Sequence, residues 1–192
     1  MVMDKIEAYL RARLDELRCL AQRGDPWVFL CASSFLEYLA RLEKGSATKA
    51  DEYKSFLRKY LYKVCPSYKR FRYSSGASDM ADQMYHVLRC GIVHGFSLVA
   101  DVTAKKHGGR DRSILLAHRS AGRKHLSAYV NNGVKPKVDA AIFVAEDFVE
   151  DIAKLAEFLF DESRKETPTA GKLRHNMRTW FTDYPPIGIQ MF

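Results

Sequence analysis

Apolar residues recur every three or four positions through the first half of the chain, a pattern that predicts amphipathic helices. The first helix is predicted over Met3 to Gln22, and Arg23-Gly24-Asp25-Pro26 can end it and begin the next one. The second helix, from Pro26 to about Lys44, is apolar around most of its circumference. We therefore expect it at the centre of a helical bundle, with Glu37 as a candidate partner for a buried base.

Two more helices are predicted before the pattern changes. Lys49 to Val64 has a face rich in tyrosine and leucine and stops before a proline. The basic and aromatic stretch Ser67 to Gly76 then leaves two alternatives open, a nucleic-acid surface or a loop whose rings pack into the core. Ser78 and Asp79 are candidate caps for a fourth helix that runs to about Ala100.

The last part of the chain changes from helical to strand-like periodicity and back. Ser113 to His118 and Leu126 to Val130 are short strand-like runs joined by a basic loop, which predicts a β-hairpin. Ala140 to Val144 is a candidate third strand. Glu146 to Ser163 has the clear apolar face of a helix, with acidic residues near its start.

These patterns together predict a mainly α fold. We expect an up-and-down helical bundle of about five helices, with a small antiparallel β-hairpin of two or three short strands inserted before the last main helix. Residues 1–163 should form one domain, because 192 residues suffice for one full core. Residues 164–192 are expected to be a linker and an irregular C-terminal tail.

Composition places the chain among globular proteins, at 47% hydrophobic and 28% charged residues. The sequence contains no apolar run long enough to span a bilayer and no secretory signal pattern at its start, so a cytoplasmic protein without a membrane partner is expected. The net charge of +8 favours polyanionic partners such as RNA, DNA or an acidic protein.

The four cysteines do not form a metal-binding pattern. Cys19, Cys31, Cys65 and Cys90 are widely spaced, with no C-x-x-C pair and no adjacent histidine that would complete a zinc site. We expect reduced, buried thiols, no metal site and no cofactor.

The segment from Gln83 to Gly95 is apolar but carries Arg89 and His94 with four residues between them. Burying a guanidinium is costly unless it is paired, which favours either a binding site or an ion pair with an acid such as Asp82 or Glu37. On an ideal α-helix the two residues would be roughly 140° apart around the axis, so they would flank a groove rather than share a face.

Other residues of the same helix fit this groove. His86 lies three residues before Arg89, close enough to share a ligand with it. Gly91 and Gly95 form a bare strip over which a second chain could approach and complete the groove.

The run Leu88-Arg89-Cys90-Gly91-Ile92-Val93-His94-Gly95 resembles the R-x(4–6)-H signature of the HEPN superfamily, small helical bundles of prokaryotic toxin, defence and RNA-processing systems. The predicted order of helices is also similar to that family. Phe35 to Leu39 resembles the acidic and apolar pattern of an earlier HEPN helix. The resemblance covers about Met3 to Glu162.

The resemblance implies a metal-independent endoribonuclease, or an RNA-binding protein, in which two copies of the motif face each other in a homodimer. His94 would then be the general acid or base, and Arg89 would hold the scissile phosphate. The candidate substrate-binding residues are His86 and Cys90 on the motif helix and Arg119, Arg123 and Lys124 in the basic hairpin loop.

Two other functions stay open. Active HEPN nucleases commonly have a polar residue after the arginine, whereas Cys90 is a weak hydrogen-bond donor, so the chain can also be a non-catalytic helical interaction module. Such a module would be a toxin–antitoxin or defence component, with an antitoxin as its protein partner. A DNA-binding regulator that uses the basic hairpin is the third alternative.

Overall fold

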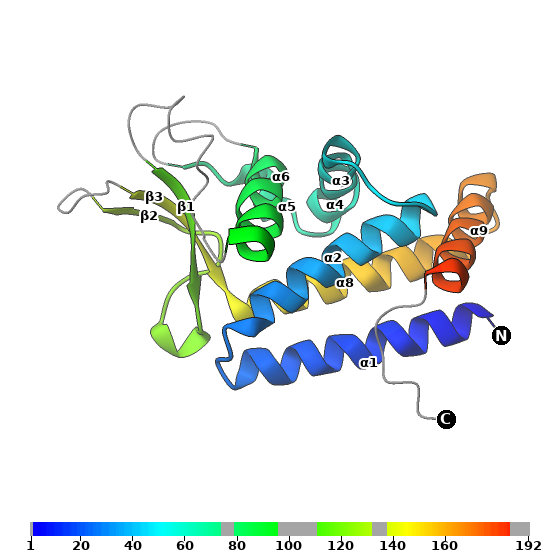
Figure 1. The fold of residues 1–192 in the computed structure, drawn as a ribbon, viewed down its shortest axis with the longest axis horizontal. Coiled ribbons are helices and arrows are strands. Elements are labelled where there is room, and N and C mark those ends of the chain that lie inside the picture. The colour runs from blue at the N-terminus through cyan, green and yellow to red at the C-terminus, as the bar shows by residue number, and fades with distance from the viewer. Residues whose placement is uncertain (1, 74–78, 96–110, 132–137, 185–192) are drawn as a thin grey trace.

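Three long helices lie side by side and form the body of the protein, with a small sheet at one end and a shorter helix across the other (Figure 1). The computed structural model describes residues 2–73, 79–95, 111–131 and 138–184, without the side chains of 91–95, 111–112, 131 and 138. The elements of the first half are α1 (Val2–Gln22), α2 (Trp27–Lys44), α3 (Ala50–Phe56), η1 (Leu57–Leu61), α4 (Tyr62–Val64), α5 (Pro66–Arg70), α6 (Met80–Gln83) and η2 (Met84–Gly95). Those of the second half are β1 (Asp111–Ala117), η3 (Arg119–Ala121), β2 (Ala128–Asn131), β3 (Val138–Val144), α8 (Ala145–Arg164) and α9 (Pro168–Asp183). The mainly helical fold with a small sheet before the last helices is therefore confirmed.

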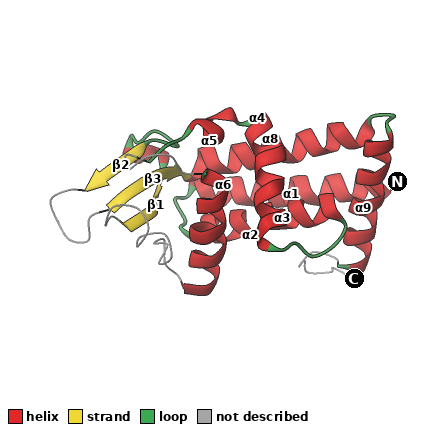
Figure 2. Cartoon of the chain, turned by 90° about the horizontal axis from the view of Figure 1, so that it is seen from above, coloured by secondary structure: helices red, strands yellow, loops and turns green. Residues whose placement is uncertain are grey.

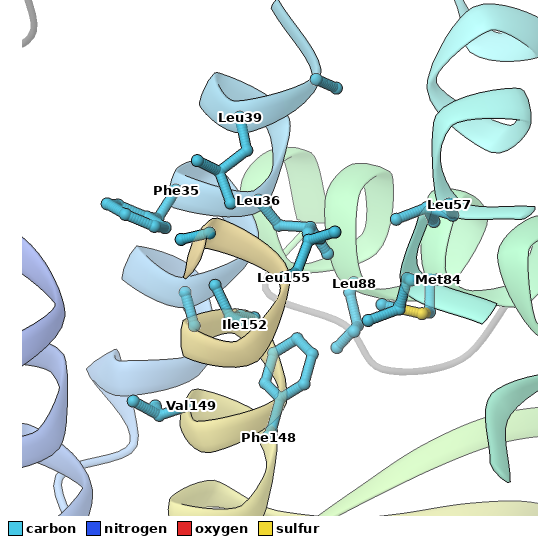
Figure 3. Packing of buried hydrophobic residues seen from close by; sticks show 14 of the residues in the cluster. Phe35, Leu36, Leu39, Leu57, Met84, Leu88, Phe148, Val149, Ile152 and Leu155 are labelled. Atoms are coloured by element: carbon cyan, nitrogen blue, oxygen red, sulfur yellow. The ribbon is translucent and has the colours of Figure 1, made fainter. Parts of the chain in front are cut away.

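Helix α2 lies at the centre, as its apolar circumference predicts. It packs against α1, α8, α9 and η2. In Figure 3 its Leu36 and Leu39 lie beside Ile152 and Leu155 of α8, while Leu88 of η2 approaches from the other side. All five side chains are at most 1% exposed, so one continuous core joins these three helices.

The sheet has a different strand order from the expected hairpin. β3 lies in the middle, parallel to β1 and antiparallel to β2, with Leu115 opposite Ile142 and Ala128 opposite Ala141. The strand-like runs around Ser113 and Leu126 therefore do not pair with each other. The reason is burial: Ala140 to Val144 are all buried, and a strand covered on both faces belongs in the interior of a sheet. Figure 2 shows this sheet beside the helical body.

The expectation of an irregular C-terminal tail is wrong for residues 168–183, which form helix α9. The side chain of Thr167 caps this helix by accepting a hydrogen bond from the N–H of Ala170, and Pro168 occupies the first turn. Its buried face packs against α1, α2 and α8, so the domain does not end at residue 163. That face consists of Ala170, Leu173, Met177 and Trp180.

The basic and aromatic stretch after α4 packs its rings into the core. Tyr68, Phe71 and Tyr73 are at most 6% exposed. The nucleic-acid alternative for these three rings is therefore wrong. The predicted cap at Asp79 is confirmed, since its carboxylate accepts from the N–H of Ala81.

A buried polar cluster attaches the sheet to the helices. The Nδ1 atom of His125 accepts a hydrogen bond from the N–H of Val144 at 3.0 Å, so its Nε2 atom carries the ring proton. That Nε2 lies 3.1 Å from the Tyr68 hydroxyl and 3.5 Å from Asp151 Oδ2. Lys154 donates to Asp151 Oδ1 at 2.8 Å. The cluster thus links α5, the β1–β2 connection and α8.

The environment of Asp151 favours its ionised form. Burial by itself would raise the pKa of the Asp151 carboxyl, but hydrogen bonds from His125, Lys154 and Cys65 outweigh burial and lower the pKa to about 2. Because the pKa of Asp151 is lower in the folded than in the unfolded chain, the ionised Asp151 carboxylate and its hydrogen bonds stabilise the fold above about pH 4. This contribution is lost as the pH falls towards 2.

We predict that Met177→Ala in α9 destabilises the whole domain by about 2–5 kcal/mol, because it opens a cavity in the shared core. Unfolding in urea, followed by circular dichroism, should keep a single transition at a lower midpoint. The control His175→Ala, on the exposed side of the same helix, should change stability by less than about 0.5 kcal/mol. A Met177→Ala protein of unchanged stability would show that α9 is not part of the folding unit.

We predict that Asp151→Asn lowers stability by about 2 kcal/mol at pH 7, the value that corresponds to a pKa shift from 3.8 to about 2. Chemical denaturation between pH 7 and pH 2 measures this difference. The gap between the wild type and the variant should narrow below about pH 4 and close only as the pH falls to about 2 and below, where the Asp151 carboxyl of the folded protein becomes protonated. A gap that is independent of pH would contradict the ionised pair.

Candidate nucleic-acid interface

The motif arginine pairs with the acid in the central helix. Arg89 Nε donates to Glu37 Oε2 at 2.7 Å, and its Nη2 donates to Oε1 at 2.8 Å, a two-pronged ion pair between η2 and α2. The side chains of Arg89 and Glu37 are 21% and 15% exposed, so the pair is shielded without being closed off from solvent. The predicted ion pair between Arg89 and an acid is therefore confirmed, with Glu37 as the partner.

A second arginine shares the same carboxylate. Arg41 lies one turn after Glu37 on α2 and donates to Glu37 Oε1 from Nε and Nη2. Burial would raise the pKa of the Glu37 carboxyl, but the hydrogen bonds from Arg89 and Arg41 lower it below its usual value. The hydrogen bonds to Glu37 also raise the pKa of Arg89. Two positive charges thus share one negative charge, and this three-residue cluster carries a net charge of +1.

Aromatic rings hold Arg89 from the other side. Its Cζ atom lies 5.1 Å from the ring centre of Tyr85 and 6.0 Å from that of Tyr53, within the range of cation–π contacts. Lys54 Nζ approaches the same Tyr85 ring at 5.2 Å and pairs with Asp82 at 2.8 Å. The guanidinium is therefore fixed in position by a carboxylate and two rings.

The other two candidate residues on the described part of η2 lie beside this group. His86 Nε2 is 3.7 Å from Asp82, and its ring contacts Tyr85 edge-on with a centroid distance of 5.1 Å. Cys90 is partly exposed and contacts Tyr85, whose pKa is raised by burial and by the neighbouring thiol. His86, Arg89 and Cys90 are therefore all connected through Tyr85. The expectation of buried thiols is confirmed for Cys65 but wrong for Cys19 and Cys31, which are exposed.

Residues 84–95 form a π-helix, and this changes the relation between the two motif positions. In a π-helix the N–H of residue i+5 donates to the carbonyl of residue i. Residues five apart in the sequence therefore lie on successive turns of the helix, one above the other. Positions 89 and 94 are separated by this interval, which differs from the α-helical geometry expected above. The side chain of His94 is not among those that the structure describes, and the same holds for the surroundings of Gly91 and Gly95.

The basic loop that connects β1 to β2, residues 118–127, is located elsewhere on the molecule. Gly24, in the turn between α1 and α2, lies close to the His118 ring at the start of η3. Glu37 lies ten residues after Trp27, the first residue of α2, and therefore about 15 Å along the helix axis. The structure therefore does not bring the loop residues together with Arg89 on one stretch of α2.

Within the loop the three candidate residues differ in their contacts. Arg119 pairs with Asp147 at the start of α8, with Nη2 at 2.8 Å from Oδ1. Arg123 is exposed, and its guanidinium lies 5.9 Å from the ring centre of Tyr129. Lys124 is exposed as well, and its carbonyl accepts from the Ser127 hydroxyl. Arg119 thus contributes to the attachment of the loop, while Arg123 and Lys124 present their charge to solvent.

Three residues at the Arg89 site were not singled out from the sequence. Arg41 could have been found from its i+4 spacing to Glu37, which is typical of helical ion pairs. Tyr85 lies four residues before Arg89 on the same helix, so the same kind of spacing indicates its contact with Arg89. Lys54 had no such local signal, because α3 and η2 meet only in the folded chain.

No protein-family model, curated protein or solved structure gives a significant match to this chain. Among the described residues, no group of three histidine, cysteine, aspartate or glutamate side chains is placed to hold a metal ion. In the same part of the chain, no helix combines the length and the apolar character needed to cross a membrane.

We predict that Glu37→Gln destabilises the protein by about 1–3 kcal/mol, because it leaves two guanidiniums side by side without their shared carboxylate. The matched control is Glu157→Gln, which breaks an equally short ion pair to Arg11 on the exposed surface of α1 and α8. That change should cost less than about 1 kcal/mol. Urea denaturation of both variants at pH 7 measures the difference, and equal losses would contradict a special role for Glu37.

Proposed function

We propose that this protein is a HEPN-type RNA-binding protein, with metal-independent endoribonuclease activity at Arg89 and His94, that acts as a homodimer. The observation that carries the proposal is the π-helical register of residues 84–95. It supports a shared site because backbone positions 89 and 94 lie on successive turns of the π-helix. On an α-helix the same two positions would be roughly 140° apart around the axis. π-Helical turns occur mostly as single-turn bulges inside α-helices, and those bulges are frequent at functional sites.

The setting of Arg89 supports a phosphate contact. Its guanidinium has five N–H donors, of which the Glu37 ion pair uses two. Arg41 adds a second positive charge, and part of the Arg89 side chain is open to solvent. An arginine whose direction is set by a carboxylate and by flanking rings loses little further freedom when it binds a phosphate.

In the proposed reaction the 2′-hydroxyl of RNA attacks the adjacent phosphorus. The new bond closes a 2′,3′-cyclic phosphate, and the 5′-oxygen of the next nucleotide leaves with a proton. His94 takes the proton from the 2′-hydroxyl or supplies the one for the leaving oxygen, and the same histidine of a second copy can perform the other transfer. Arg89 stabilises the charge that develops on the phosphate oxygens.

The net charge of +8 supports a polyanionic substrate, and the partly exposed His86 and the exposed Arg123 and Lys124 are proposed to contribute to RNA binding. A second copy of the chain is proposed as the partner that completes the groove beside η2.

A non-catalytic helical interaction module, such as a toxin–antitoxin or defence component, is the second candidate. It is favoured by the contacts of Arg89 itself, since the Glu37 ion pair ties η2 to the central helix and gives Arg89 a structural task. Cys90 beside it favours the same alternative, because a thiol orients a phosphate poorly.

We predict that the purified full chain cleaves single-stranded RNA in the presence of EDTA and leaves 2′,3′-cyclic phosphate ends. Arg89→Lys and His94→Ala should each lower the cleavage rate by about 100-fold or more. Arg89→Lys keeps the positive charge opposite Glu37 but removes the planar fork, so its loss of activity cannot be assigned to unfolding if its melting temperature stays near the wild type.

The matched control is Arg18→Ala. Arg18 forms an equally short two-pronged ion pair with Glu150 between α1 and α8, away from η2. This variant should cleave RNA like the wild type. If the wild type binds and cleaves no RNA, while Arg89→Ala only lowers the melting temperature, the interaction module is the correct function.

A further inference from the structure

A cavity of about 560 Å³ lies between α1 and α2, next to the C-terminal end of α9. Its volume falls within the range of about 300–1,000 Å³ that is typical of small-molecule sites. Aromatic rings dominate its lining, from Tyr9 on α1, Phe35 and Tyr38 on α2, and Trp180 with Tyr184 at the end of α9. Such walls fit a flat, largely apolar molecule.

Three polar atoms of the lining residues have no hydrogen-bond partner within the described part of the chain. They are Arg13 Nε, the Tyr38 hydroxyl and Trp180 Nε1. The Trp180 side chain belongs to a residue that is only 4% exposed, so solvent does not take the place of the missing partner. A buried polar group without a partner is costly, and native proteins contain few of them.

All three atoms are hydrogen-bond donors in this setting. The Arg13 Nε and indole Nε1 atoms can only donate. Burial raises the pKa of Tyr38 above its usual value, so its hydroxyl also keeps its proton at neutral pH. The acidic side chain in the lining, Glu16, is already engaged with Arg13 Nη2 at 2.7 Å. The cavity therefore offers donors and lacks a matching acceptor among its described residues.

The charge of the lining also favours a ligand that carries hydrogen-bond acceptors. Within the lining, Arg13 and Arg41 carry two positive charges and Glu16 carries one negative charge, while Arg41 also shares the Glu37 carboxylate with Arg89. Arg41 also lies over the Trp180 ring, with its Cζ atom 5.7 Å from the ring centre. A carboxylate would find both guanidinium groups and unsatisfied N–H and O–H donors at the edge of an aromatic slot.

We infer that this cavity is a binding site for a planar aromatic carboxylate; the inference does not rest on the proposed RNA binding, although the lining residue Arg41 also contacts Glu37. The aromatic body would lie among Tyr9, Phe35 and Tyr184, and the carboxylate would accept from the donors of Tyr38 and Trp180. Tyr184 is 58% exposed and stacks on the face of Trp180 with ring centres 4.1 Å apart, so it forms an exposed aromatic wall beside the indole.

The test uses 2-naphthoate as the probe and the indole N–H signal of Trp180 as the reporter. The chain has two tryptophans, so Trp27→Phe in the ¹⁵N-labelled full chain leaves Trp180 as the single indole signal in a ¹H–¹⁵N spectrum. We expect 2-naphthoate to move this signal saturably, with a Kd below about 1 mM. The cation 2-naphthylmethylammonium, of similar shape, should bind at least about tenfold more weakly.

Tyr38→Phe separates ligand binding from a purely structural role of this hydroxyl. Because the hydroxyl is unsatisfied in the empty cavity, its removal should raise the melting temperature, whereas the affinity for 2-naphthoate should fall about five- to tenfold. The matched control Tyr129→Phe, in strand β2, should leave the affinity unchanged.

Three results would overturn the inference. The first is no saturable response of Trp180 to 2-naphthoate, and the second is equal affinity for the anion and the cation. The third is binding only after residues 185–192 are deleted, because the chain itself would then be the occupant of the cavity.

Discussion

The carboxylate of Glu37 is the constraint around which the helices are arranged. Helix α2 is enclosed by α1, α8, α9 and η2, so a charge on it has to be neutralised by a neighbour. Arg89 and Arg41 meet this need, and the first of them attaches the motif helix to the centre of the bundle. The apolar side of the same helix, with Met84 and Leu88, completes the core in Figure 3. The position of the candidate site therefore follows from how the core is closed.

Two widened helical segments accompany this arrangement. Residues 57–61 and 84–95 are both π-helical, and the helices that contain them pack against each other through α3 and α6. Backbone positions five apart, such as 89 and 94, are linked by the i+5 hydrogen-bond pattern of a π-helix, whereas on an α-helix they would be roughly 140° apart around the axis. Because Arg89 joins η2 to the central helix and is also the proposed phosphate contact, stability and activity have to be measured together for its variants.

Local patterns in the sequence predicted the long helices, the central place of α2 and the cap at Asp79. They also offered an ion pair with an acid as one of two alternatives for Arg89. Each of these depends on periodicity or on a charge in apolar surroundings, both of which are readable within one segment. The prediction failed for α9, although Thr167, Pro168 and the spacing of its buried residues were local signals of a helix. It also failed for the strand order, because pairing within a sheet depends on which strand is covered on both faces.

By itself, the sequence determined the helical class, which residues form the bundle core, and the presence of an arginine and a histidine in an apolar segment. Each of these can be recognised within one segment, from the helical periodicity or from a charged residue among apolar neighbours. Only the tertiary structure decided that Glu37 is the acid that meets Arg89, and that Tyr53, Lys54 and Tyr85 surround it. It also decided that unsatisfied donors from α1, α2 and α9 line one cavity. These contacts join residues up to 167 positions apart, from Arg13 to Trp180, and no local pattern encodes which distant surfaces meet when the core closes.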